Sequence, residues 1–218
     1  SSRQNQIRDF YIWRESRDGC EPNNWKAEFG GSAWTHNPAT GDYYLGVFSP
    51  YQPDLNWENP ELRRRIYEIM LWWARRGVDG FRLDVINFLS KAPGLPDVIP
   101  PEGASEKQRY YSGSKFYVDQ PGIHSLLQEM RREVFAKAGV MAVGECHGQT
   151  LAPEAESGGR YIRAANGELD MMFHFDIPWF FRHRKTGEGF ALIGEWLKAA
   201  QPDGWTTITL NNHDSPRQ

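Results

Sequence analysis

From residue 59 onward, apolar positions follow a helical period and then gather in a short apolar run. Asn59 is suited to cap a helix and Pro60 to occupy its first turn. Apolar residues then recur at helical spacing until Gly77: Leu62, Ile66, Ile69, Met70 and Trp73. The short β-branched stretch 81–86 that follows is typical of a buried strand. The pattern therefore predicts a helix followed by a strand.

The same order returns twice along the chain. A second helix is predicted to end at Gly139, directly before a strand over 140–145. A third helix over 190–200 precedes a strand over 205–210, and 169–177 is a further strand candidate. The inward-facing residues are predicted to be Ile123, Leu126, Leu127, Met130 and Val134 in the second helix, and Ile193, Trp196 and Leu197 in the third. Helices that alternate with apolar strands indicate a parallel sheet covered by helices.

Three other regions lack a regular period. Residues 1–58 contain a Gly-Gly pair and several prolines, which predicts a loop-rich excursion with short strands, for example over 43–48. The stretches 87–120 and 147–168 are rich in glycine, proline and charge, and each follows the end of a predicted strand. Long segments at the carboxyl ends of parallel strands commonly build an active site.

A carboxylate stands at or near the end of three predicted strands: Asp84, Glu145 and Asp214. An acidic side chain that closes an apolar strand costs free energy unless it is paired or used. In a parallel barrel these strand ends converge on one face. Carboxylates that meet there can divide into a nucleophile and a proton donor, as glycoside cleavage requires. Spacing alone does not say which carboxylate has which role.

Composition narrows the possible partners. The 218 residues include 25 basic and 28 acidic side chains, and the net charge of −3 argues against nucleic acid or an anionic membrane as a partner. Hydrophobic residues make up 39% and charged residues 24%, which is typical of a globular protein. No apolar run approaches the roughly 20 residues of a membrane span.

The two cysteines and the metal-binding motifs give further expectations. Cys20 and Cys146 are too few for a disulfide scaffold, which favours a reducing compartment and predicts a cytoplasmic location. The sequence has no HExxH motif, no Cys/His cluster and no EF-hand spacing. We therefore predict no metal and no cofactor.

Three segments, taken in order, resemble signatures of glycoside hydrolase family 13, the α-amylase superfamily: GFRLDVIN at 80–87, VGE at 143–145 and NHD at 212–214. The segment QPDLN at 52–56 resembles a further signature, and its glutamine points to the oligo-1,6-glucosidase and α-glucosidase subgroup. The resemblance implies a partial (β/α)8 TIM barrel with a loop-rich domain B. Residues 1–58 would form part of domain B, and 59–218 would run from about the third helix to the seventh strand of the barrel.

The resemblance also implies roles for the three carboxylates. Asp84 is similar to the nucleophile of retaining enzymes, and Glu145 to the general acid/base, with about 5 to 5.5 Å between the two carboxyl groups. Asp214 resembles the carboxylate that binds sugar hydroxyls. Arg82 resembles the arginine that hydrogen-bonds the catalytic carboxylates, and His213 a hydroxyl donor in the same subsite. A structural salt bridge between Arg82 and Asp84, and a structural pair of His213 with Asp214, are the alternatives.

Two more residues concern specificity. In the subgroup that the chain resembles, a valine directly after the nucleophile accompanies a preference for α-1,6 bonds, which points to Val85. Ordinary strand packing explains a valine there equally well. His147 lies where a residue could line the +1 subsite, but a surface histidine is as good an interpretation. The sequence ECHG at 145–148 departs from the Met-Pro pair common in oligo-1,6-glucosidases.

The resemblance thus predicts a retaining exo-α-glucosidase that acts on α-1,6 bonds of isomalto-oligosaccharides. Alternatives within the class are an α-1,4-glucosidase, a trehalose-6-phosphate hydrolase and a transglucosylase. A non-catalytic relative, such as the family-13-like subunits of amino-acid transporters, is the alternative from another class. Those relatives typically lose members of the carboxylate set, whereas Asp84, Glu145 and Asp214 are all present here.

Overall fold

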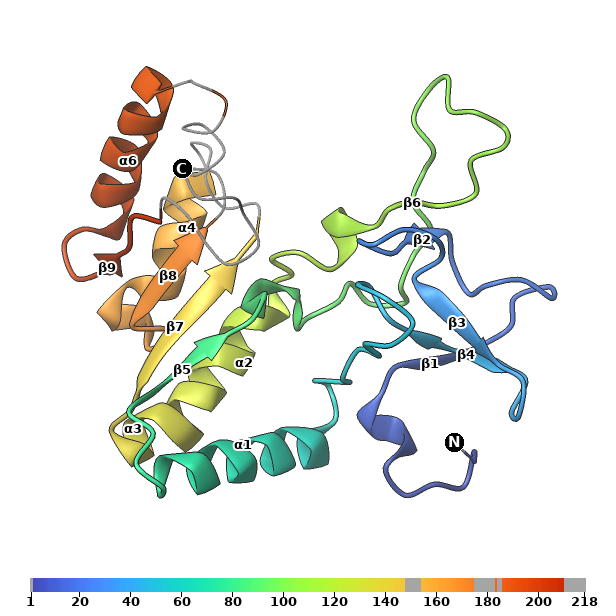
Figure 1. The fold of residues 1–218 in the computed structure, drawn as a ribbon, viewed down its shortest axis with the longest axis horizontal. Coiled ribbons are helices and arrows are strands. Elements are labelled where there is room, and N and C mark those ends of the chain that lie inside the picture. Colours follow the sequence, from blue (N-terminus) through green and yellow to red (C-terminus); the bar gives the residue numbers. More distant parts are fainter. Residues whose placement is uncertain (1, 148–153, 175–182, 184–185, 210–218) are drawn as a thin grey trace. The chain divides into compact units, whose positions relative to one another are not determined.

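The computed structural model describes residues 2–147, 154–174, 183 and 186–209 (Figure 1). The chain divides into two compact units. The first unit consists of Ser1–Ile66 and Leu89–Gln120, and the second of Tyr67–Phe88 and Pro121–Gln218.

The first unit contains two small sheets. One is antiparallel with the strand order β1-β4-β3, and the other is a parallel pair of β2 and β6. The strands are β1 (Trp13–Glu15), β2 (Trp25–Lys26), β3 (Trp34–Asn37), β4 (Asp42–Leu45) and β6 (Tyr111–Ser112), with short 3-10 turns at η1 (Arg8–Phe10) and η3 (Ser114–Phe116). The strand expected over 43–48 is therefore present as β4, shifted by one residue and ended earlier.

A buried tryptophan explains why residues 89–120 belong to the first unit. Trp25 is fully buried, its ring lies parallel to that of Phe116 at 5.9 Å between centroids, and its indole Nε1 donates to the carbonyl of Pro96 at 2.8 Å. A Cβ on Gly113 would stand 2.8 Å from this ring, so the backbone there lies directly on the indole. The compact units therefore divide the chain differently from the boundary expected after residue 58.

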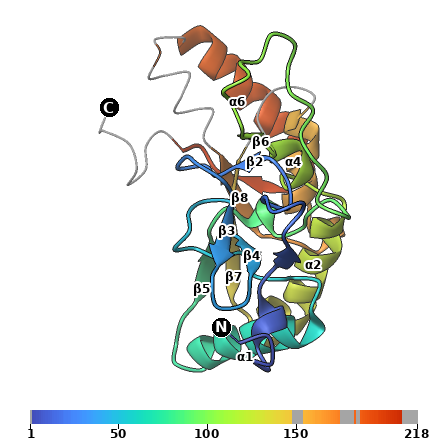
Figure 2. The ribbon, with the colours of Figure 1, turned by 90° about the vertical axis from the view of Figure 1, so that its right-hand side faces the viewer.

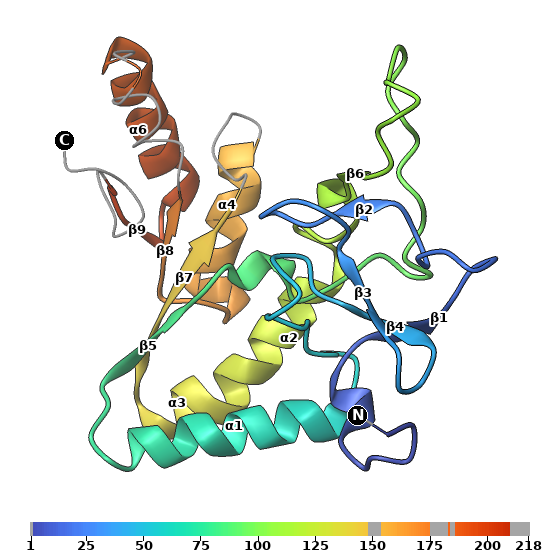
Figure 3. The same cartoon turned by 45° about the vertical axis from the view of Figure 1, so that its right-hand side comes forward.

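The second unit contains a parallel sheet with the strand order β5-β7-β8-β9 (Figure 3). Its strands are β5 (Gly80–Leu83), β7 (Met141–Cys146), β8 (Met171–His174) and β9 (Trp205–Thr206). Each strand is short and follows a helix in the chain. The alternating pattern predicts this order for β5, β7 and β9, whereas the helix before β8 was not expected. Because all four strands are parallel, their carboxyl ends lie at one edge of the sheet.

Helices cover this sheet, and α2 and α4 lie on the same side of it (Figure 2). The helical elements are α1 (Pro60–Ala74), η2 (Ile86–Phe88), α2 (Gly122–Met130), η4 (Arg131–Phe135), α3 (Ala136–Ala138), α4 (Glu154–Ile162), η5 (Ala164–Asn166) and α6 (Thr186–Ala200). The helix α4 packs against α6 and β8. Across the residues that the structure describes, no helix has the length and apolar character needed to span a membrane.

The predicted helix boundaries have clear physical causes. The Asn59 side-chain Oδ1 accepts hydrogen bonds from the backbone amides of Glu61 at 2.9 Å and Leu62 at 3.3 Å, which caps α1 as expected. The second helix runs through α2, η4 and α3 to Gly139, whose left-handed conformation (φ 65°) ends it. Glycine is suited to this position because it has no Cβ to resist positive φ.

Four expectations about the elements were wrong. The strand expected over 205–210 is shorter, because β9 ends at Thr206 and residues 207–209 lie outside any strand. The strand expected over 81–86 ends at Leu83, because the chain turns at Val85 into η2. The stretch 147–168, expected to be irregular, contains α4. Leu197, expected to face inward, is 44% exposed, and α6 instead buries Leu192, Trp196, Ala199 and Ala200.

Candidate active site

The register of β5 and β7 brings two of the predicted carboxylates together. Leu83 pairs with Gly144 in the parallel ladder, so the next residues, Asp84 and Glu145, stand side by side at the carboxyl ends of neighbouring strands. Arg82 lies on β5, two residues before Asp84. The two acids are 61 residues apart in sequence and meet through strand pairing.

One guanidinium contacts both carboxylates. Arg82 Nη1 donates to Oδ1 of Asp84, and Arg82 Nη2 forms an ion pair with Oε2 of Glu145. The two acids differ in exposure, with the Asp84 side chain 72% exposed and that of Glu145 5%. Two carboxyl groups in unlike surroundings are the arrangement by which one site separates a nucleophile from a proton donor.

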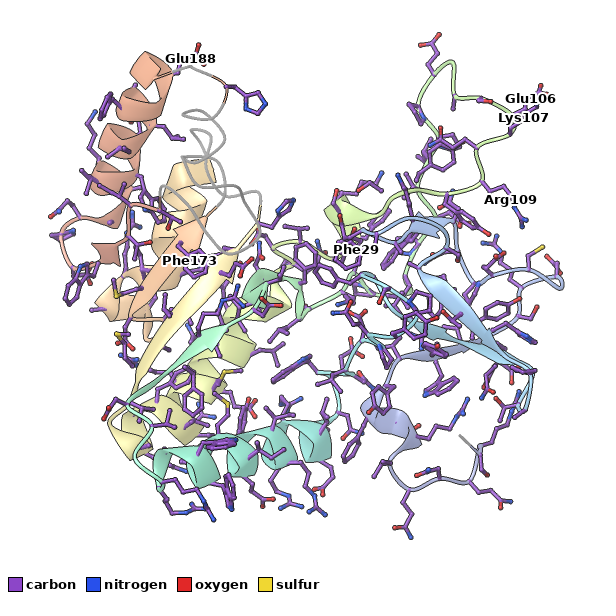
Figure 4. The ribbon with its side chains drawn as sticks, viewed as in Figure 1. Phe29, Glu106, Lys107, Arg109, Phe173 and Glu188 are labelled. Atoms are coloured by element: carbon purple, nitrogen blue, oxygen red, sulfur yellow. The ribbon has the colours of Figure 1, made fainter. Side chains whose placement is uncertain are left out.

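A third strand adds an aromatic ring that sequence reasoning missed. Phe173 of β8 pairs with Glu145 in the ladder, and its ring centroid lies 5.6 Å from the guanidinium carbon of Arg82 (Figure 4). At this distance the ring face attracts the cation. Only the register of β8 against β7 identifies this residue, because 169–177 by itself indicates nothing more than a strand.

The backbone turns sharply directly after Asp84. Val85 has a positive φ of 38°, which a β-branched residue rarely adopts. The amide of Phe88 donates to the carbonyl of Val85 at 3.1 Å and closes the turn into η2. The three residues of η2 are all buried. Val85 thus lies in a tight turn beside the acids, where ordinary strand packing does not apply.

His147 follows β7 and is held from its backbone. Its carbonyl accepts a hydrogen bond from the Asn87 side-chain amide at 2.8 Å, and its own amide donates to Asn87 Oδ1 at 3.2 Å. Its ring lies edge-on to Phe88 with 6.0 Å between centroids. His147 is exposed and stands two residues beyond Glu145.

His213 and Asp214 lie outside the described residues. Gln52, from the further signature segment, belongs to the first unit, where Ser49 Oγ donates to its Oε1 at 3.0 Å. Within the described ranges, no group of three or more His, Cys, Asp or Glu side chains could hold a metal ion.

A cavity of about 440 Å³ lies at the opposite end of the sheet. It is lined by the first residues of β7, β8 and β9 and by an ion pair in which Arg131 donates two hydrogen bonds, of 2.8 and 2.6 Å, to Asp170. Burial raises the pKa of Asp170, but the Arg131 guanidinium and the amide of Ala142 outweigh burial and hold this pKa below its usual value. Asp84 and Glu145 are not among the residues that line this cavity.

Comparison with known proteins identifies the family. Residues 1–218 match the model described as alpha amylase, catalytic domain. The chain is 46% identical to the oligo-1,6-glucosidase of Halalkalibacterium halodurans and 45% identical to that of Parageobacillus thermoglucosidasius. Each match covers 99% of this chain and 39% of the relative.

Solved structures agree with this assignment. The crystal structure of Bacillus licheniformis trehalose-6-phosphate hydrolase superposes with a TM-score of 0.85 at 37% identity, covering 100% of this chain and 39% of that one. The chain therefore belongs to the α-amylase family and lies in its catalytic domain. The fold of that domain is a (β/α)8 barrel, of which the parallel sheet and helices of the second unit are a part. The chain spans about two fifths of the length of these relatives.

Proposed function

We propose that the chain contributes catalytic residues to a retaining exo-α-glucosidase that hydrolyses α-1,6-glucosidic bonds at the non-reducing ends of isomalto-oligosaccharides. The observation that carries the proposal is the single guanidinium of Arg82 in contact with an exposed Asp84 and a buried Glu145. The names of the two oligo-1,6-glucosidases support the substrate class. The cysteine usage supports a cytoplasmic location.

In the proposed first step, an Asp84 carboxylate oxygen attacks the anomeric carbon of the terminal glucose. The glycosidic C–O bond breaks, and Glu145 gives its proton to the departing oxygen. A glucosyl ester on Asp84 results. Arg82 forms an ion pair with Asp84, and the exposure of the Asp84 side chain leaves its carboxyl group open to the substrate.

In the second step, water gives a proton to Glu145 and attacks the same anomeric carbon. The ester bond breaks, the Asp84 carboxylate is restored, and glucose is released. Two displacements at one carbon return its original configuration. On the resemblance alone, Asp214 and His213 would bind hydroxyl groups of the same glucose.

The bond specificity is the finer part of the proposal. Val85 adjoins Asp84 and His147 lies two residues beyond Glu145, so both side chains are close in sequence to the reacting groups. We assign them to substrate binding, with Val85 favouring α-1,6 bonds and His147 at the +1 subsite. The likeness to a trehalose-6-phosphate hydrolase keeps that substrate as the second candidate.

The test compares glucose release from isomaltose, maltose and trehalose 6-phosphate by the complete enzyme that carries this chain. We expect isomaltose to have the highest kcat/KM, and the glucose first released to be the α-anomer by proton NMR. A preference for trehalose 6-phosphate or maltose would overturn the α-1,6 assignment. Release of the β-anomer would contradict the double displacement, and turnover of none of the three would contradict the glucosidase assignment.

A further inference from the structure

The short helical turn after Asp84 contacts β7 on both sides of Glu145. A Cβ on Gly144 would stand 3.0 Å from Ile86 Cγ2, so Ile86 lies directly over the residue before Glu145. Asn87 hydrogen-bonds both backbone groups of His147, two residues after Glu145. Glu145 therefore lies between two residues, Gly144 and His147, that η2 contacts.

The Asn87 side chain is suited to this task. An asparagine amide carries a donor and an acceptor in one plane, as a peptide group does, so a pair of hydrogen bonds fixes both position and orientation. Asn87 is fully buried, where an unmade hydrogen bond is costly. The pair spans 60 residues of sequence and joins the turn that carries Asp84 to the strand that carries Glu145.

We propose that Asn87 is a positioning residue that fixes the Glu145 carboxyl relative to the leaving oxygen, by holding the end of β7 against the turn after Asp84. The proposal rests on the proposed glucosidase function. A general acid must stand within hydrogen-bond reach of the atom it protonates, and a displacement of about 1 Å can cost about 10²-fold in rate. Asn87 itself does not touch the reacting atoms in this proposal.

Substrates that differ in their need for an acid distinguish positioning from simple structural support. The leaving group of isomaltose is a sugar alkoxide, which needs a proton from the acid. The leaving group of α-glucosyl fluoride is fluoride, which departs without one. For N87A we expect kcat/KM to fall about 10²-fold for isomaltose and less than about threefold for α-glucosyl fluoride. The ratio of the two values does not depend on how much of the preparation is folded. N87S provides the same test if N87A cannot be prepared.

Asn24 in the first unit provides a matched control. Its side chain makes the same pair of hydrogen bonds with a backbone, donating to the carbonyl of Val98 at 2.8 Å and accepting from the amide of Val98 at 2.7 Å. We expect N24A to leave the ratio of the two substrates at the wild-type value. An unchanged ratio in N87A and N87S as well would overturn the proposal.

Hydrogen exchange separates this proposal from the proposed function. By mass spectrometry, N87A should speed exchange at the amide of His147 and leave that of Val98 protected, and N24A should do the reverse. If the wild-type enzyme cleaves neither substrate, the glucosidase proposal fails, and with it the effect on catalysis. The exchange result still decides whether Asn87 holds the end of β7, and unchanged protection at His147 would overturn that.

Discussion

The two compact units secure their backbones in different ways. In the first unit, the strands are two to four residues long, and buried side chains complete the hydrogen bonding. Asn23 accepts from the amide of Trp25 at 3.0 Å and from the indole of Trp34 at 2.7 Å, and donates to the carbonyl of Leu95 at 3.0 Å. In the second unit, a four-stranded parallel ladder pairs the backbones of the strands, and helices pack closely against one another.

Glycines mark the close packing of the second unit. A Cβ on Gly144 would stand 2.5 Å from Leu169 Cδ1, and one on Gly159 would stand 2.4 Å from the carbonyl oxygen of Ala199. The difference between the units has a direct consequence for substitutions. Two substitutions test these contacts: the loss of a buried polar side chain in the first unit and the gain of a methyl group in the second.

The largest expected effect on stability follows the removal of Asn23 from the first unit. N23A leaves the Trp25 amide, the Trp34 indole and the Leu95 carbonyl without their partner, which should lower the free energy of unfolding by about 3 kcal/mol or more. Urea unfolding followed by tryptophan fluorescence measures this. The exposed Asn5, which accepts one hydrogen bond from the amide of Ile7, provides the control N5A. If N23A and N5A lowered the free energy of unfolding by equal, small amounts, the role given to buried polar side chains in the first unit would be wrong.

A methyl group added to the second unit should have the next largest effect. G144A would overlap Leu169 and crowd Ile86, and overpacking of this kind costs about 1–3 kcal/mol. Apart from the backbone of its own helix and its two neighbours in the chain, Gly194 in α6 has no atom within 4 Å of its Cβ position, so G194A should be neutral or stabilising by up to about 1 kcal/mol. Thermal unfolding of both variants checks the difference. A G144A protein as stable as G194A would contradict the packing argument.

A smaller, pH-dependent effect is expected at Asp170. Its folded pKa lies below the usual value, so its ion pair stabilises the fold above the unfolded pKa, and this contribution is lost as the pH falls through the folded pKa. D170N should therefore cost about 1–2 kcal/mol at pH 7 and progressively less below about pH 4. Urea unfolding of both proteins across this pH range measures the change. A difference that grows in acid would refute the sign.

Sequence patterns predicted the elements whose signals are local. The cap at Asn59 and the stop at Gly139 each depend on a few neighbouring residues, and both are confirmed. The helix α4 was missed because its two adjacent glycines argue against a helix, whereas here they allow contact with α6. Leu197 was misplaced for a related reason. The small Ala199 lets α6 approach α4 closely, so the helix faces inward along its alanines.

The site residues also divide into those that a local sequence pattern predicts and those that depend on tertiary structure. A carboxylate at the end of an apolar strand is visible in the sequence, and Asp84 and Glu145 do lie together. Arg82 was named from its resemblance to a family motif, and the structure shows that it contacts both acids. The position of Phe173 depends on the register of β8 against β7. The hydrogen bonds between Asn87 and His147 join residues 60 positions apart, and no local pattern contains such a contact.

The central claim is that Asp84 is the nucleophile, and the isomaltose assay of D84N beside D79N tests it most directly. Asp79 is an exposed acid just before the amino end of the same strand, so D79N makes the same chemical change away from the proposed site. We expect D84N to lose at least about 10³-fold in kcat and D79N to stay within about twofold of the wild type. Near-normal turnover by D84N would contradict the account.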